Sequence, residues 1–360
     1  MTYLDYQATT PLAPEALAAM LPWLERQHAN PHAAHREGRA ARAAVEIARD
    51  AVAASMPPGG MVTFTSGATE ALNWAIKGTD GPIVTLATEH AAVLDTAAAT
   101  GRAVTMLPVG RDGLVDLDAA RAAIVPGVGL VAAMLVNNEI GVIQPIAALA
   151  DLAHASGALF LCDAVQGYGR VPVPAECDMV AVSAHKIHGP KGVGALWTRD
   201  GVRPRVLLHG GGQETAGRSG TLSPALCAGF GAAAGLMRDH GAADAAHVAA
   251  LWEAATSRLG PGWRINGSIE ARYRGNLNIR HAQLDVARLM SDLRDVAFSA
   301  GSACASGSGR PSHVLRAIGL GDPAARGSIR LGFGRYTALA ELTAAIDAIV
   351  DAAARQRIAA

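Results

Sequence analysis

Lysine is rare in this chain, and one lysine stands where an amine could do covalent chemistry. The sequence contains three lysines, Lys77, Lys186 and Lys191, against twenty-eight arginines. Lys186 follows the apolar run 179–182 and precedes a turn rich in glycine and proline. An amine held just beyond a buried strand is suited to form a Schiff base with an aldehyde. Taken alone, a lysine in this place more often points to solvent, so the interpretation depends on its neighbours.

Other apolar runs in the chain also end in polar clusters. Because ligands of open α/β sheets bind at the carboxyl ends of the strands, such clusters can meet at one site. A single cluster is weak support, since loops between strands and helices are often polar. Together the five predict one shared pocket, and they comprise residues 66–70, 88–90, 137–139, 163–166 and 183–186.

The residue types in these clusters match what pyridoxal phosphate needs. A helix begins at the segment Ser66-Gly67-Ala68-Thr69, whose free backbone N–H groups, together with the Thr69 hydroxyl, suit a phosphate. An ordinary serine or threonine helix cap is the alternative. Asp163 ends a buried strand, where a carboxylate needs a partner such as a protonated pyridine nitrogen. Lys186 would then carry the cofactor aldehyde.

Three more side chains could touch the cofactor ring. His90 could stack on the ring or move protons, although a lone histidine is more often structural. Asn138 and Gln166 could hydrogen-bond the ring hydroxyl. We therefore include all three among the candidate cofactor-binding residues.

The order of apolar runs and helix-length segments predicts an α/β fold. Strands alternating with helices indicate a mostly parallel sheet covered on both faces. A long helical pattern over residues 224–259 is typical of an element that links two domains. We expect a large domain over residues 14–245 and a smaller α+β domain over residues 1–13 and 246–360. The predicted strands are 61–65, 83–87, 103–109, 130–136, 158–161, 179–182, 193–197, 277–280 and 328–333, and the other predicted helices are 14–26, 39–55, 70–77, 91–100, 146–156 and 338–357.

Composition argues against several classes of protein. The formal net charge of zero gives no basic footprint for nucleic acid. No apolar stretch is long enough to cross a bilayer, and residues 1–6 do not resemble a signal peptide. The cysteines Cys162, Cys177, Cys227 and Cys304 are irregularly spaced, which argues against a disulfide framework and a zinc site. We expect a cytoplasmic enzyme without a metal.

Six segments, taken in order, resemble the cysteine desulfurases. These are class V aminotransferase-like enzymes that use pyridoxal phosphate and have fold type I. The resemblance therefore implies a fold-type I pyridoxal-phosphate-dependent transferase, with the small domain carrying a catalytic cysteine loop. The resemblance runs from Tyr3 to about Arg335, and its segments are 3–11 (YLDYQATTP), 64–70 (FTSGATE), 88–90 (TEH), 137–141 (NNEIG), 185–192 (HKIHGPKG) and 218–221 (RSGT).

The resemblance also implies roles for residues that the pattern alone does not single out. Ser183 and His185 would contact the phosphate, and Thr221 would reach it from the neighbouring subunit of a homodimer with shared active sites. Arg330 matches the arginine that binds the substrate carboxylate, assisted by Asn30 and by Asn138. A guanidinium can bind a carboxylate through two bonds, although a surface strand arginine is the alternative for Arg330.

Cys304 lies in a run of small residues, 299–310, that cannot pack a core and predicts a mobile loop. A thiol there could enter the pocket, take up sulfur as a persulfide and pass it on. An incidental surface cysteine is the alternative. The resemblance implies that Cys304 is the persulfide-forming nucleophile, and the spacing to residues 312–315 is similar to that of the long-loop subgroup.

The expected reaction converts L-cysteine to L-alanine and leaves a persulfide on Cys304. Lys186 would take the α-proton and His90 would act as acid or base on the thiol. An acceptor protein would receive the sulfur for iron–sulfur cluster assembly or for thiolation of tRNA or cofactors. The alternatives are selenocysteine lysis, transamination and a non-catalytic sulfur carrier. Ala184 departs from the glycine usual in these enzymes, which would strain the backbone if that position needed a positive φ.

Overall fold

A seven-stranded sheet forms the centre of the molecule in the computed structural model, which describes residues 1–214, 217–301 and 312–358. Only β8 runs antiparallel to its neighbours β2 and β7, while the remaining pairs are parallel. The predicted α/β fold with a mostly parallel sheet is confirmed. In sheet order the strands are β2 (Gly60–Thr65), β8 (Gly194–Arg199), β7 (Met179–Ser183), β6 (Leu159–Asp163), β5 (Leu130–Met134), β3 (Ile83–Leu86) and β4 (Val104–Leu107).

Side chains alternate between two cores on the opposite faces of this sheet. In β7, Met179 and Ala181 join the core beneath α3 and α4, while Val180 and Val182 join the core on the other face. Because successive strand residues point to opposite faces, a strand covered on both sides reads as continuously apolar. The helices that connect these strands are α3 (Ala68–Lys77), α4 (Ala91–Ala99), α5 (Leu117–Ala123) and α6 (Ile146–Ser156).

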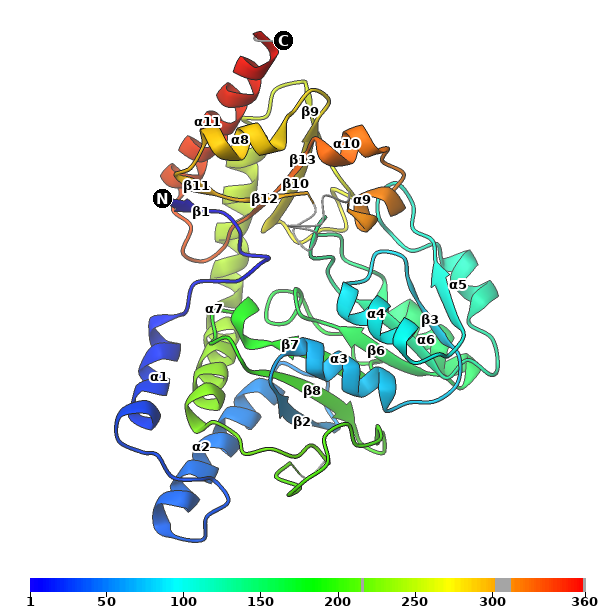
Figure 1. Ribbon diagram of the computed structural model, residues 1–360, viewed down its shortest axis with the longest axis vertical. Coiled ribbons are helices and arrows are strands. Elements are labelled where there is room, and N and C mark those ends of the chain that lie inside the picture. The colour runs from blue at the N-terminus through cyan, green and yellow to red at the C-terminus, as the bar shows by residue number, and fades with distance from the viewer. Residues whose placement is uncertain (215–216, 302–311, 359–360) are drawn as a thin grey trace.

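The long helix α7 (Pro224–Thr256) joins the two halves of the molecule (Figure 1). Ser223 caps its first turn and Pro224 occupies the first helical position, where a missing N–H costs nothing. Phe230 packs in the core of the large sheet, whereas Leu251 packs in a second core further along the helix. The predicted linking helix is thus present. Helices α1 (Pro14–Glu25) and α2 (Arg36–Ala53) pack against its first half.

The second core is built from both ends of the chain. Leu4 packs there with residues between 251 and 353. An antiparallel sheet in the order β12-β13-β10-β9 supports this core, and β1 (Thr2–Tyr3) pairs with β11 (Val296–Ala297) beside it. The exact domain boundaries at residues 13 and 245 stay a prediction. The other elements are β9 (Trp263–Ile265), β10 (Asn276–His281), α8 (Val286–Asp292), β12 (Ser299–Ala300), α9 (His313–Ala317), α10 (Asp322–Arg326), β13 (Ser328–Gly332) and α11 (Leu339–Ile358).

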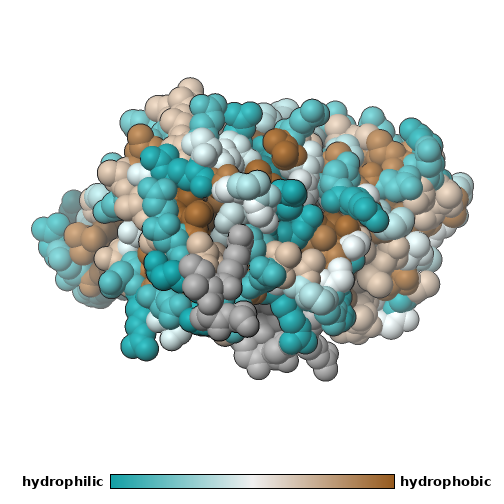
Figure 2. All heavy atoms as spheres, turned by 90° about the horizontal axis from the view of Figure 1, so that it is seen from above, coloured by the Kyte–Doolittle hydropathy of each residue, from teal (hydrophilic) through white to brown (hydrophobic). Residues whose placement is uncertain are grey.

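The surface seen from above the second core is mixed in character. Hydrophilic residues predominate on this face, and hydrophobic residues are scattered in small groups (Figure 2). None of the helices in the described part of the chain has both the length and the apolar character that crossing a bilayer requires.

Candidate active site

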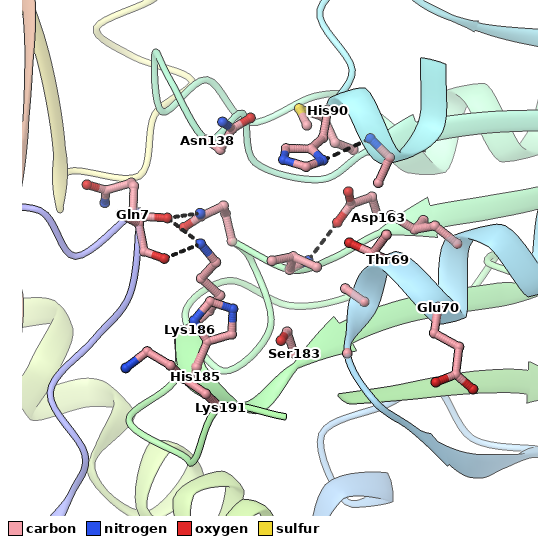
Figure 3. A pocket seen from close by; sticks show the side chains of 18 of the residues that line it. Gln7, Thr69, Glu70, His90, Asn138, Asp163, Ser183, His185, Lys186 and Lys191 are labelled. Atoms are coloured by element: carbon pink, nitrogen blue, oxygen red, sulfur yellow. Dashed lines mark hydrogen bonds between the residues drawn. The ribbon is translucent and has the colours of Figure 1, made fainter. Parts of the chain in front are cut away.

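A cavity of about 480 Å³ lies at the carboxyl ends of the strands of the large sheet (Figure 3). Each of the five polar clusters contributes to its wall, so the chain brings them together as the sequence predicted. The predicted residues that line the cavity are Ala68, Thr69, His90, Asn138, Asp163, Gln166, Ser183, His185, Lys186 and Arg330.

Lys186 reaches the cavity from a short 3₁₀ helix (Ala184–Lys186) that directly follows β7. Its Nζ donates hydrogen bonds to the backbone carbonyls of Gln7 and Ala8, the latter at 2.8 Å. Ala184 does not have a positive φ, since His188 is the only non-glycine residue with one in the described ranges. Alanine in place of glycine at position 184 is therefore not strained.

Asp163 is buried at the carboxyl end of β6. One carboxylate oxygen accepts a hydrogen bond from the Val165 N–H at 3.0 Å. Burial raises the pKa of Asp163, while the nearby His90 and Lys186 lower it. A buried carboxylate at a cavity wall is stabilised best by a cationic group that enters the cavity.

His90 caps the start of α4 from the cavity wall. Its Nδ1 accepts a hydrogen bond from the Ala92 N–H at 3.0 Å. Burial lowers the pKa of His90, although Asp163 opposes this effect, so the neutral ring is favoured. Because Nδ1 is an acceptor, the ring proton of the neutral form lies on Nε2.

The first turn of α3 presents backbone N–H groups at one end of the cavity. Gly67 precedes the helix, and no side chain in the described part of the chain caps it. Glu70 accepts a hydrogen bond from the Ser66 N–H at 2.7 Å and pairs with Arg218 at 2.8 Å. Uncapped N–H groups and the positive end of a helix dipole form a site suited to an anion. Thr69 lines the cavity at the same helix end.

His185 lines the cavity from the same short 3₁₀ helix as Lys186. Its Nδ1 lies 3.1 Å from the Thr9 hydroxyl. Burial, together with the charges of Lys186 and Lys191, lowers the pKa of His185 to about 4. The ring is therefore neutral at neutral pH, and it adds no charge beside the lysines.

Arg330 provides a cation that is almost fully buried at the edge of the cavity. Only 2% of it is exposed, and it lies 2.8 Å from Asp5 and 3.1 Å from the Asn138 carbonyl. Its Nε is buried and lacks a hydrogen-bond partner among the described residues. An unpaired buried donor of this kind suits an incoming carboxylate, because leaving it unsatisfied costs about 1–3 kcal/mol.

Two amide side chains were predicted to face the cofactor ring. Gln166 donates from Nε2 to the carbonyl of Gln7 at 2.9 Å, the same carbonyl that accepts from Lys186. Asn138 lines the cavity, and its own carbonyl holds Arg330.

Three predicted residues are not placed in this cavity. Asn30 and Thr221 are exposed and are absent from its lining within the single chain. The Asn30 side chain instead accepts a hydrogen bond from the His32 N–H at 2.9 Å. Cys304 lies outside the described residues.

Several groups that complete the site have no direct signal in the sequence. The carbonyls of Gln7 and Ala8 hold Lys186, and Lys191 lines the cavity. Arg170 bonds the backbone carbonyls of Gln166, at 3.2 Å, and of Lys186. The segment 3–11 can be recognised as a motif in the sequence, but the contacts of its backbone carbonyls with Lys186 form only when the chain folds.

Comparison with models of protein families shows to which family the chain belongs. The model of the aminotransferase class-V family matches residues 2–344. The chain belongs to the class-V aminotransferase family. Members of this family use pyridoxal phosphate as cofactor.

Two curated members of the class-V family illustrate its relatives. The cysteine desulfurase IscS of Rickettsia bellii is 41% identical over 368 residues, which cover 96% of this chain and 90% of that protein. A probable mitochondrial cysteine desulfurase of Dictyostelium discoideum is 41% identical over 96% of this chain and 81% of its own length.

Two solved structures have the same architecture as this chain. The NifS-like protein from Rickettsia africae superposes with a TM-score of 0.91 at 30% identity, covering 98% of this chain and 99% of that one. SspA in complex with cysteine superposes with a TM-score of 0.84 at 33% identity, covering 94% of this chain and all of its own (100%). The fold-type I expectation is confirmed.

Proposed function

We propose that this class-V family member is a cysteine desulfurase that converts L-cysteine to L-alanine and transfers the sulfur to Cys304. The observation that carries the proposal is the joint presence of Lys186, Asp163 and Arg330 in one cavity. The curated relatives that match almost the whole chain are named cysteine desulfurases, which supports the same reaction.

The residues of the cavity fit pyridoxal phosphate. The uncapped start of α3 suits the phosphate, and the buried Asp163 carboxylate suits a protonated ring nitrogen. Thr69, Ser183, His185 and Ala68 would complete the phosphate site. When bound, the cofactor supplies an aldehyde for Schiff-base chemistry and a ring that accepts electrons from the substrate carbon. Asp163 strengthens that acceptance by keeping the ring nitrogen protonated.

The amine of Lys186 is placed to move the substrate's α-proton. The Gln7 and Ala8 carbonyls accept hydrogen bonds from the free amine, and the same contacts would position it once the substrate has released it from the cofactor. His90 offers an Nε2–H on the other wall, where it can exchange a proton with the substrate sulfur. In the same proposal, the ring of His90 would stack on the cofactor.

The substrate carboxylate would bind to Arg330. Arg330 lines the cavity, its buried Nε has no hydrogen-bond partner among the described residues, and its guanidinium donates to the Asn138 carbonyl. The Asp5 carboxylate, 2.8 Å away, partly neutralises the charge and keeps the guanidinium in place. In this proposal, binding of the carboxylate to Arg330 would orient an L-amino acid in the cavity that Lys186 also lines.

Cys304 would attack the substrate sulfur as a thiolate. A new S–S bond forms, the carbon–sulfur bond of cysteine breaks, and the carbon skeleton leaves as alanine after protonation. On one side of the segment, Ser299 lies 3.2 Å from Arg330, which lines the cavity. On the other side, His313 lies 2.8 Å from the carbonyl of Glu89, the residue before His90.

The same proposal includes a homodimer with shared active sites, in which Thr221 serves the phosphate of the neighbouring subunit. Asn30 would assist Arg330. The exposure of Asn30 and Thr221 in the single chain is consistent with roles that a second subunit completes. The persulfide would pass to a sulfur-acceptor protein, for iron–sulfur cluster assembly or for thiolation of tRNA or cofactors, and the enzyme would act in the cytoplasm.

The function is tested by measuring alanine and sulfide together from L-cysteine and a reductant. The wild-type holoenzyme should form both in equal amounts. Cys304→Ala should lose alanine formation from cysteine while its bound cofactor keeps its visible absorption. Cys227→Ala, in the core of α7, is the matched control and should remain active. Full turnover by Cys304→Ala would refute the role of this thiol.

A further inference from the structure

A second cavity, of about 280 Å³, lies on the other side of Arg170 from the active site. It is bounded by α7, by residues 169–171 and 272–274, and by residues 334–335. Part of its wall is apolar and comes from Val171, Met237, Val248 and Ala249. A small ligand with an apolar body could be accommodated there.

The charged residues of this cavity are unbalanced. Among the described residues, four arginines line it, Arg170, Arg272, Arg274 and Arg335, and Asp244 contributes the one carboxylate, which leaves an excess of three positive charges. His188 adds no charge at neutral pH, because burial lowers its pKa to about 4.

These arginines differ in how far the protein already satisfies them. Arg272 donates to three backbone carbonyls, those of Ser268, Asn276 and Asn266, so it needs no further acceptor. Arg335 pairs with Asp244, but its Nε is buried and has no partner among the described residues. An anionic oxygen is the group that would satisfy this donor.

Arg170 connects this cavity to the active site. Its guanidinium donates to the Gln166 carbonyl at 3.2 Å, to the Gln166 side chain at 3.3 Å and to the Lys186 carbonyl. The same guanidinium stacks over the Tyr273 ring at 5.1 Å, and Tyr273 also lines the second cavity. A group that draws Arg170 toward the second cavity therefore alters the support of Lys186.

We propose that the second cavity binds a small organic carboxylate and that Arg170 transmits its occupancy to Lys186. The carboxylate would accept from the Nε of Arg335, and its apolar body would lie against Met237 and Val248. An inorganic anion lacks the apolar body and should bind more weakly. The binding does not depend on the proposed function, whereas the effect on Lys186 rests on it.

Benzoate is the probe for a calorimetric titration of the holoenzyme. Ala249→Phe should fill the cavity and weaken benzoate binding at least tenfold. Ala250→Phe makes the same change one position along α7, where the residue is exposed and outside the lining, and should bind as the wild type does. Arg335→Gln should also weaken binding at least tenfold, while Arg238→Gln, an exposed arginine of α7, should not.

The visible absorption of the cofactor reports the coupling. Benzoate should shift this band in the wild type and in Ala250→Phe, but not in Ala249→Phe. Because Ala249→Phe leaves Arg330 unchanged, loss of the shift in that variant excludes benzoate bound at Arg330 as its cause. The site would be overturned if the wild type did not bind benzoate, or if it bound inorganic phosphate as tightly as benzoate. It would also be overturned if Ala249→Phe bound benzoate as tightly as Ala250→Phe, or if Arg335→Gln bound it as tightly as the wild type. Binding without a spectral shift would overturn the coupling. Alanine formation, measured separately, decides the proposed function whichever result is found.

Discussion

His188 should make the protein less stable in acid, and the size of the effect can be worked out from its surroundings. The ring is 3% exposed, and burial, with the charges of Arg170 and Arg335, lowers its pKa from 6.5 to about 4. The unfolded chain therefore binds a proton between pH 6.5 and pH 4 that the folded chain does not. Stability from this group is complete above pH 6.5 and is lost as the pH falls toward 4.

The loss amounts to about 2 kcal/mol between pH 7.5 and pH 5 for a pKa difference of about 2.5 units. His188→Asn should remove it. Asparagine tolerates the positive φ of 69° at this position, and its amide can donate to the Pro11 carbonyl as Nδ1 does now at 3.0 Å. The variant loses ring contacts with Tyr336 and Tyr6 at every pH, so only the pH-dependent difference is diagnostic.

Urea denaturation at pH 7.5 and pH 5, with equal protein and saturating cofactor, measures this difference. The free energy of unfolding should fall by about 2 kcal/mol less in His188→Asn than in the wild type. His240→Asn, at an exposed position of α7, is the matched control and should behave as the wild type. Identical pH dependence in His188→Asn and the wild type would refute the reasoning.

Two further predictions concern the active site. Asp163→Asn should lower the rate of alanine formation by about 10²–10³-fold, because the cofactor ring nitrogen loses its anionic partner. Rapid-mixing kinetics of the cofactor-loaded variant measure this rate, and an unchanged rate would contradict the role of Asp163. Arg330→Lys should lower kcat/KM for cysteine by about 10²-fold, since a lysine cannot donate in the geometry of a guanidinium. Steady-state kinetics measure this ratio, and a wild-type value of kcat/KM would exclude Arg330 as the residue that binds the substrate carboxylate.

The part of the site that lies at strand ends could be predicted from the sequence. Asp163 and Lys186 each follow an apolar run, and parallel strands bring such positions to one edge of a sheet. The linking helix could be predicted because its pattern spans residues 224–259 without a break, although the helix ends at Thr256.

The remaining contacts could not be predicted, because they depend on backbone groups and on distant parts of the chain. The Gln7 carbonyl that holds Lys186 is 179 positions away in sequence. Arg170 reads as an ordinary polar residue in a loop, and only the folded chain places it against Lys186. Asn30 and Thr221 were assigned by resemblance, and a single chain does not bring them to the cavity.

Covalent attachment of the cofactor to Lys186 is the claim on which the proposed chemistry depends. Borohydride treatment of the holoenzyme, followed by peptide mapping, should place a pyridoxyl group on Lys186. The chain has only two other lysines, Lys77 on α3 and Lys191 at the cavity, so the label can be assigned without ambiguity. A pyridoxyl group on Lys191 or Lys77, or no label on any lysine, would contradict the account.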